Sequence, residues 1–161
     1  MTFRRGVRLA LDLGQARIGV AACDPDAILA HPVRTVRAGG GKFGPDDPAL
    51  DELLEIVEEY QPREVVIGLA TSLSGQDGPA ARRIRQRARR FAAAVAEDGI
   101  TVRLVDERFT TTSAARQLQQ AGRRSHQQRS VIDQAAAVAI LEHALETERR
   151  TGEPPGEPVE P

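Results

Sequence analysis

The stretch Val7–Cys23, VRLALDLGQARIGVAAC, decides the fold class. Val7–Leu13 and Ile18–Cys23 are short runs rich in aliphatic and β-branched residues, and the intervening GQAR has the composition of a turn. Two such runs around a short turn predict a β-hairpin. The chain therefore opens with paired strands rather than with a strand that leads into a helix.

The rest of the chain alternates strands and helices. We expect further strands over Pro32–Val36, Glu64–Leu69 and Thr101–Val105, and a loop from Ala38 to Pro48. The first expected helix follows this loop and has Leu50, Leu53, Leu54 and Val57 on one face. Three more helices are expected, from Pro79 to about Glu97, over Thr110–Gln120 and from Ser130 to about Arg149. Grouped strands followed by alternating helices indicate an α/β fold, a mixed β-sheet flanked by helices. We expect a single domain over residues 1–150. The tail 151–161, TGEPPGEPVEP, is rich in Pro and Glu and is expected to be disordered.

Composition excludes several kinds of function. Aromatic residues make up only 3% of the 161 residues, so the chain has little material for stacking bases. Cys23 is the only cysteine, which rules out an intrachain disulfide and a multi-cysteine zinc site. The opening MTFRRGVRLALDLG shows neither a signal peptide nor a membrane span. We therefore expect a cytoplasmic protein without a membrane partner.

Two carboxylates follow or end predicted strands. Asp12 lies in a mostly apolar strand, where burial of a carboxylate is costly unless it is hydrogen-bonded or holds a metal. The alternative for Asp12 is an Asx-type turn at the hairpin. Glu107 comes directly after Val102–Val105, and because adjacent residues of an extended chain face opposite ways, only one of Asp106 and Glu107 points the same way as Asp12. The alternative for either acid is a weak surface ion pair.

A third carboxylate, Asp133, precedes the apolar run QAAAVAIL. One interpretation is a capping box, with Ser130 as N-cap and Asp133 in the first helical turn. The apolar residues that follow indicate a buried helix instead, in which an inward carboxylate needs a partner. Together Asp12, Glu107 and Asp133 offer the hard oxygen ligands that Mg²⁺ or Mn²⁺ prefers. Two such ions, roughly 3.5–4 Å apart, suit the hydrolysis of phosphodiesters. We predict that these three residues are catalytic and metal-binding.

Basic residues are segregated although the net charge is −1. On the predicted helix from Pro79, arginines fan around the side opposite Ile84, Phe91 and Val95. This face is either only solvated or binds phosphate, since Arg contacts phosphates bidentately. A second basic stretch precedes Asp133. The predicted nucleic-acid-binding residues are Arg82, Arg83, Arg87, Arg90, Arg123, Arg124, His126 and Arg129.

Four stretches resemble, in order and spacing, the signatures of the YqgF/RuvX family: DLGQARIGVAACDP, VVIGLATSLSGQDGPAARR, VDERFTTTSAARQL and VIDQAAAVAILEHAL. The resemblance implies an RNase H-like fold and a nuclease acting on pre-16S rRNA or on Holliday junctions. The metal-binding acids of the family fall on Asp12, Glu107 and Asp133. One departure is Ala70, where the family usually has Pro, which leaves the shape of the loop Thr71–Asp77 open.

Alternatives remain within and beyond this family. A Holliday junction resolvase, which requires a homodimer to cut two strands, shares the same metal chemistry as an rRNA-processing nuclease. A non-catalytic nucleic-acid-binding factor that keeps the acids for structure is a further alternative. An actin-like or sugar-kinase ATPase also opens with Asp-x-Gly after a strand, but it requires two lobes and a longer chain.

Overall fold

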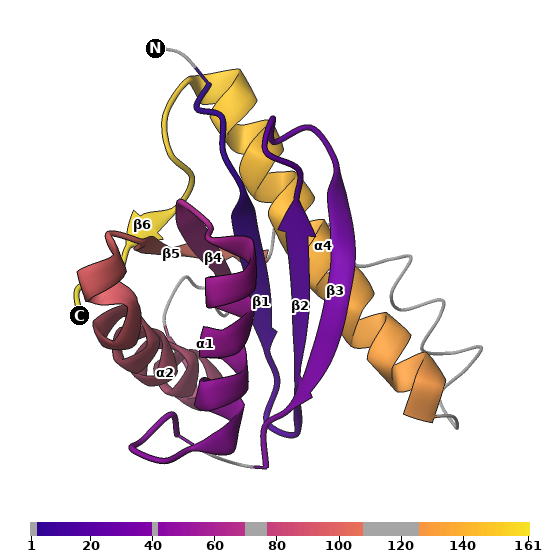
Figure 1. Cartoon of the computed structure of the whole chain (residues 1–161), viewed down its shortest axis with the longest axis vertical. Helices are drawn as coiled ribbons and strands as arrows, with labels where there is room; N and C mark the ends of the chain where they lie inside the picture. The colour runs from indigo at the N-terminus through magenta and orange to yellow at the C-terminus, as the bar shows by residue number, and fades with distance from the viewer. Residues whose placement is uncertain (1–2, 40–41, 70–76, 108–125) are drawn as a thin grey trace.

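The computed structural model describes residues 3–39, 42–69, 77–107 and 126–161, with the side chains of the last helix described from Ile132 onward. In chain order the elements are β1 (Arg8–Leu13), β2 (Arg17–Cys23), β3 (Ala30–Arg37), α1 (Pro48–Tyr60), β4 (Glu64–Leu69), α2 (Pro79–Val95), the 3-10 turn η1 (Ala96–Asp98), β5 (Thr101–Asp106), α4 (His126–Thr151) and β6 (Glu157–Pro158) (Figure 1). The helix expected over Thr110–Gln120 and nearly all of the loop Thr71–Asp77 lie outside the described residues.

The strands form one mixed sheet in the order β3-β2-β1-β4-β5-β6. The hairpin partner β2 is antiparallel to β1, whereas β4 is parallel to β1 and β5 is parallel to β4. The predicted mixed sheet with a leading hairpin is therefore confirmed. Because β1 lies between β2 and β4, its residues Leu9, Ala10 and Leu11 are paired on both sides.

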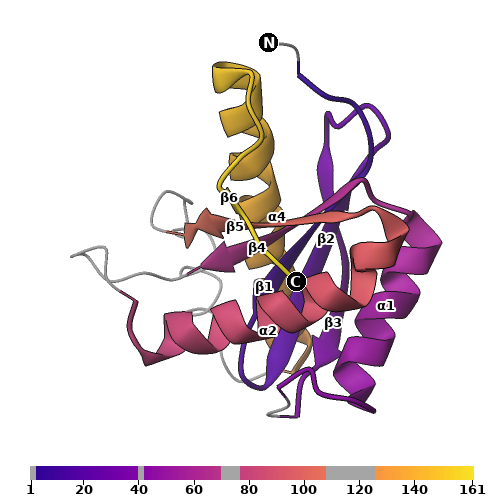
Figure 2. The same cartoon turned by 90° about the vertical axis from the view of Figure 1, so that its left-hand side faces the viewer.

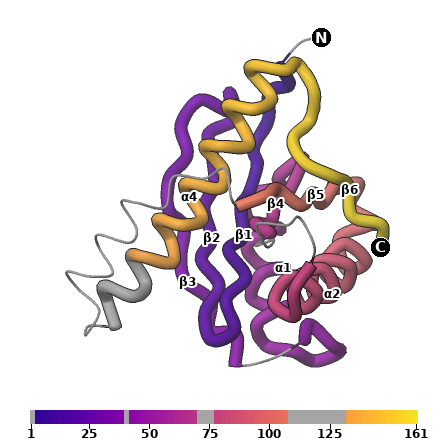
Figure 3. The backbone as a smooth tube through the Cα atoms, turned by 180° about the vertical axis from the view of Figure 1, so that it is seen from behind, coloured from indigo at the N-terminus to yellow at the C-terminus, as the bar shows by residue number. Residues whose placement is uncertain are grey.

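Side chains alternate between the two faces of the sheet. Leu9 and Leu11 of β1 join a core with residues of α1 and α2, such as Leu53 and Phe91. Ala10 joins a second core with α4. Figures 2 and 3 show this division, with α1 and α2 on one side of the sheet and α4 running across the other.

The far end of α4 is fixed by buried ion pairs. Glu148 accepts hydrogen bonds from Arg4 at 2.7 Å and from Arg8 at 3.2 Å. Glu64, at the start of β4, is bound by Arg4 and by Arg103 Nε at 3.0 Å. Arg8, Glu64 and Glu148 are each no more than 2% exposed. Removing one partner of such a network leaves a buried charge uncompensated, which is strongly destabilising.

The start of the last helix differs from the sequence prediction. The last helix begins at His126 rather than Ser130, so Asp133 lies about two turns inside it. The capping-box interpretation of Ser130 and Asp133 is therefore wrong.

Among the helices of the described ranges, none combines the length and apolar character needed to cross a bilayer.

The C-terminal tail also differs from the expected disorder. Glu157 and Pro158 form β6, which pairs with Leu104 and Arg103 of β5, and Val159 donates its backbone N–H to the Val102 carbonyl at 2.8 Å. The composition of the tail argues against an apolar core of its own. The tail pairs with an existing sheet edge instead, where backbone hydrogen bonds and an ion pair from Arg85 to Glu157 at 2.7 Å hold it.

Candidate metal centre

Asp12 lies near the carboxyl end of β1, opposite Gly19 of β2 in the antiparallel register. Ala10, two residues earlier on the same strand, packs against α4, so alternation puts Asp12 on the α4 face. In the neighbouring parallel pair, Leu11 is beside Ile67, which brings Gly68 next to Asp12 on the other side. Asp12 is thus flanked by glycines, and no side chain of an adjacent strand covers it.

The space over Gly68 is filled by Glu107. A Cβ built on Gly68 would lie 2.6 Å from Glu107 Oε1 and 2.6 Å from Ile140 Cδ1. Glu107 and Asp12 share a side-chain hydrogen bond. Of the adjacent pair Asp106 and Glu107, it is therefore Glu107 that reaches Asp12.

The space over Gly19 is filled by the backbone of α4. A Cβ on Gly19 would lie 1.9 Å from the carbonyl oxygen of Asp133, so any larger residue would push the helix away. Glycine inside a strand often marks such a close approach of another backbone. Gly19 thereby brings Asp133 near Asp12, on the same face of the sheet.

Asp133 is held by an arginine. Arg17, at the start of β2, donates from Nε to Asp133 Oδ2 at 2.7 Å. Both side chains are partly exposed, at 35% for Arg17 and 20% for Asp133. Gln134, the next residue of α4, donates to Thr35 Oγ1 of β3 at 3.2 Å. The helix is thus tied to β2 and β3 beside the carboxylates.

The electrostatics of the three acids reflect their crowding. Burial, and then the neighbouring Glu107, raises the pKa of Asp12 to about 7, with a smaller contribution from Asp133. Burial also raises the pKa of Glu107. Carboxylates that repel one another in a partly dry site favour a shared proton or a bound cation. Here Asp12 and Glu107 share a proton, and the guanidinium of Arg17 pairs with Asp133.

The donor set fits a hard divalent cation. Carboxylate oxygens suit Mg²⁺ and Mn²⁺, and the glycines on either side of Asp12 leave room beside it. With Asp133 turned to Arg17, no three metal-ligating side chains in the described part of the chain surround one point closely enough to hold an ion. The three acids therefore share one neighbourhood, and an ion would have to draw Asp133 from Arg17 toward the other two.

Residues 6–147 match the family RuvX, described as Holliday junction resolvase. The chain belongs to the RuvX family. It is 54% identical over 158 residues to a protein of Streptomyces coelicolor, and the match covers 98% of this chain and 90% of that protein. It is also 54% identical over 161 residues to a protein of Streptomyces avermitilis, where the match covers 99% of this chain and 98% of that protein. Both relatives are named "Putative pre-16S rRNA nuclease".

Solved structures agree with this RuvX assignment at the level of fold. A structure titled T. thermophilus RuvC in complex with Holliday junction substrate superposes with a TM-score of 0.57 at 19% identity, covering 95% of this chain and 99% of that one. A second Thermus thermophilus RuvC structure gives a TM-score of 0.55 at 17% identity. The predicted RNase H-like fold is confirmed.

One predicted nucleic-acid contact in this RuvX chain is wrong. Arg87 was expected on the exposed side of α2, but it is only 6% exposed. Its Nη1 donates to the Gly14 carbonyl at 3.0 Å and its Nη2 to the Leu13 carbonyl at 2.9 Å. The guanidinium also lies 5.7 Å from the centre of the Phe43 ring. Arg87 therefore anchors α2 to the β1–β2 turn and offers nothing to a phosphate.

The other predicted contacts divide into two groups. Arg82, Arg83 and Arg90 are exposed on α2, although Arg82 also donates to the Asp77 carbonyl and Arg90 to the Lys42 carbonyl. Arg123 and Arg124 lie outside the described residues. His126 and Arg129 belong to the first turns of α4, and their side chains lie outside the described part as well.

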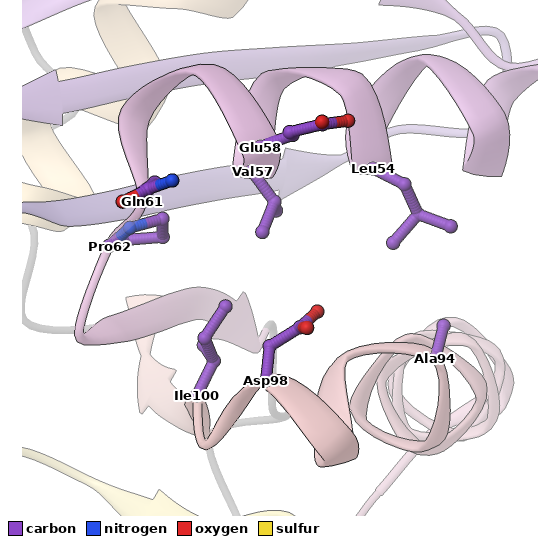
Figure 4. Close-up of a pocket in the computed structure, with 8 residues that line it drawn as sticks. All are labelled: Leu54, Val57, Glu58, Gln61, Pro62, Ala94, Asp98 and Ile100. Carbon is purple, nitrogen blue, oxygen red and sulfur yellow. The ribbon is translucent and has the colours of Figure 1, made fainter.

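A cleft of about 640 Å³ in the RuvX chain lies away from the acids, between α1 and the end of α2 (Figure 4). Leu54, Val57 and Ile100 line it, with Glu58 and Asp98 beside them. These carboxylates would repel a phosphate backbone. The cleft therefore does not extend the candidate site.

Sequence reasoning did not single out Arg17, Gly19 or Gly68. A signal for the glycines was present, because each stands inside an aliphatic strand where its lack of a side chain is unfavourable unless another group approaches closely. Arg17 was assigned to the turn between the first two strands. The position of α4 over β2, which makes Arg17 a partner of Asp133, is a tertiary feature that the local sequence does not show.

Proposed function

We propose that this chain is a metal-dependent endonuclease that hydrolyses phosphodiester bonds in structured nucleic acid, with the precursor of 16S rRNA as its substrate. The relatives that match almost the whole chain carry that name. The observation that carries the proposal is the pairing of Asp12 with Glu107 over Gly68, with Asp133 beside them. This concentration of acids at one place of the sheet is costly unless cations neutralise it.

Asp12, Glu107 and Asp133 would hold Mg²⁺ or Mn²⁺, two ions in the arrangement we propose. Bound there, the ions would activate water and neutralise charge on the attacked phosphate and the leaving oxygen. Asp12 and Glu107 must give up their shared proton to serve as ligands, since only the ionised carboxylates attract a cation strongly. Gly19 and Gly68 fix the positions of Asp133 and Glu107 relative to Asp12. Arg17 neutralises Asp133 until that carboxylate turns to an ion.

Cleavage of a transcript that spans the 5′ end of 16S rRNA tests the proposal. We expect cleavage by the purified chain in Mg²⁺ or Mn²⁺, and none in EDTA. Asp12→Asn and Glu107→Gln should abolish it, while Glu55→Gln, on the exposed side of α1, should not change it. Cleavage that survives Asp12→Asn would contradict the assigned site. A chain that binds the transcript and never cuts it would instead be a non-catalytic factor.

A second candidate activity is the resolution of Holliday junctions, for which the family description and the fold shared with RuvC argue. The metal chemistry would be the same, but two strands must be cut symmetrically, so the active form would be a homodimer. Parallel assays on a four-way DNA junction and on the rRNA transcript, with the molecular mass measured in solution, separate the two. Either activity fits a cytoplasmic protein.

A further inference from the structure

Two arginines face each other on the hairpin side of the carboxylates. Arg17 of β2 and Arg37 of β3 are directly opposite in the antiparallel register. Directly opposite residues point to the same face, and like charges in that position are destabilising. Arg17 reaches Asp133 on α4, so both arginines belong to the face that carries Asp12. The pair therefore costs stability next to the proposed metal centre.

Within the described residues, Asp133 is the one carboxylate that pairs with either of these two arginines. Arg17 uses only Nε, on Asp133, so no hydrogen bond within the described residues occupies its two Nη groups. Arg37 is exposed and has no hydrogen bond or ion pair with any described residue. The other arginines of the strands do have carboxylate partners: Arg8 pairs with Glu148, Arg34 with Glu52 and Glu59, and Arg103 with Glu64. Among the described residues of the strands, Arg37 is thus the arginine without a carboxylate partner, and Arg17 opposite it has two Nη groups left over.

A purely structural role explains this arrangement poorly. A partly exposed ion pair such as Arg17–Asp133 contributes little to stability, and α4 is already held there by its contact with Gly19. The Arg17–Asp133 ion pair also does not explain why a second arginine, Arg37, lies opposite Arg17. An anionic ligand that lies across both strands would account for the two arginines together.

We propose that Arg17 and Arg37 form a phosphate-binding pair, which holds the nucleic-acid backbone on the β2–β3 side of the carboxylates. The inference rests on the proposed nuclease function and names a contact surface for its substrate. Arg37 is two strands away from Asp12 and two residues further along, which puts it about 12 Å from Asp12, since strands are about 4.8 Å apart and each residue adds about 3.4 Å. The pair would thus contact phosphates next to the one being cleaved. Arg is suited to this task because its planar fork binds phosphate oxygens bidentately.

The test is binding of a short RNA duplex and of a four-way DNA junction, in EDTA, over a range of salt concentrations. Arg37→Gln should weaken binding several-fold and reduce the slope of log K against log salt by roughly 0.9, the value of one lost duplex contact. Arg17→Gln should act similarly, and Arg17→Lys should restore most of the slope. The matched control is Arg34→Gln, three residues away on the same strand but paired with α1 on the opposite face.

Identical salt slopes for Arg37→Gln and Arg34→Gln would overturn the proposal, as would failure of the wild-type chain to bind either probe. Thermal unfolding of each variant shows that a change in slope does not come from a loss of folded protein. Because binding is measured without divalent metal, the result is independent of cleavage. A chain that binds through Arg37 but cuts neither the rRNA transcript nor the four-way DNA junction would refute the nuclease function and leave the phosphate-binding pair intact.

Discussion

Arg87 of α2 is joined to Leu13 by a hydrogen bond of 2.9 Å, from Nη2 to the carbonyl oxygen at the end of β1. The same guanidinium binds the carbonyl of Gly14, so one buried cation satisfies two backbone acceptors at the turn that follows Asp12. The Arg87 guanidinium lies between α2 and this turn, so it fixes the backbone directly after Asp12, a proposed metal ligand.

Arg87→Gln should therefore destabilise the protein. The shorter side chain cannot satisfy both carbonyls, and hydrogen bonds to a charged group contribute roughly 1.5–3 kcal/mol each. We expect a loss of about 2 kcal/mol in the free energy of unfolding, measured by urea titration. Arg83→Gln, one turn away and exposed, should change it by less than about 0.5 kcal/mol. Equal stability of the two variants would show that the anchoring role is wrong.

The exposed arginines of α2 remain predicted phosphate contacts. Replacing Arg82, Arg83 and Arg90 together with Gln should weaken binding to RNA and DNA alike, because backbone contacts carry no sequence information. The slope of log K against log salt should become shallower by roughly 0.9 for each lost duplex contact. Parallel salt titrations with an unchanged slope would mean that this face is only solvated.

Asp12→Asn should stabilise the metal-free protein at neutral pH. The pKa of Asp12 is about 7 in the folded state, above the ordinary value of about 3.9 in the unfolded chain. The folded protein therefore binds the proton more tightly, and the stability of the wild type falls as pH rises from about 4 to about 7. Asn does not titrate, so the free energy of unfolding of the variant does not fall in this way as pH rises.

The advantage of Asp12→Asn should be small at pH 4 and grow to about 4 kcal/mol at pH 7.5, since the folded and unfolded pKa values differ by about 3 units and each unit corresponds to about 1.4 kcal/mol. Chemical unfolding in EDTA at both pH values measures it. A constant difference between the two proteins across this range would contradict the raised pKa. Added Mn²⁺ should stabilise the wild type and leave the variant nearly unchanged.

Gly19→Ala tests the close approach of α4 to β2. The new methyl group would overlap the Asp133 carbonyl, so the helix must shift or the strand must bend. Overpacking of this kind costs about 1–3 kcal/mol, and displacement of Asp133 should weaken Mn²⁺ binding measured by calorimetry. Gly44→Ala is the matched control, because its Cβ would meet nothing within 4 Å. Equal behaviour of the two variants would mean that Gly19 does not position Asp133.

The strands, Asp12 within β1 and Glu107 directly after β5 were predictable because their signals are local. Alternation along β1 and β5 already limited the partner of Asp12 to either Asp106 or Glu107. The glycines opposite and beside Asp12 are also visible in the sequence, although their role depends on which strands become neighbours. The parallel placement of β4 beside β1 is what brings Gly68 and Glu107 to Asp12.

Other features depend on packing that no local pattern encodes. A helical wheel separates the apolar side of α2 from its arginines, but it does not show that Arg87 lies over a turn with two free carbonyls. The start of α4 at His126 was missed because HQQRS lacks apolar periodicity, and Ser130 resembles an N-cap. Arg17 acquires its partner only when α4 crosses β2.

The short strand β6 has a consequence for how the protein behaves at high concentration. Without it, β5 would present the unpaired backbone groups of an edge strand, which are a template for pairing with another copy. The strand that covers β5 is only two residues long and includes Pro158, and short edge strands with proline resist further addition. A chain cut before Gly156 should therefore self-associate, in a concentration-dependent manner, under conditions that leave the full-length chain dispersed.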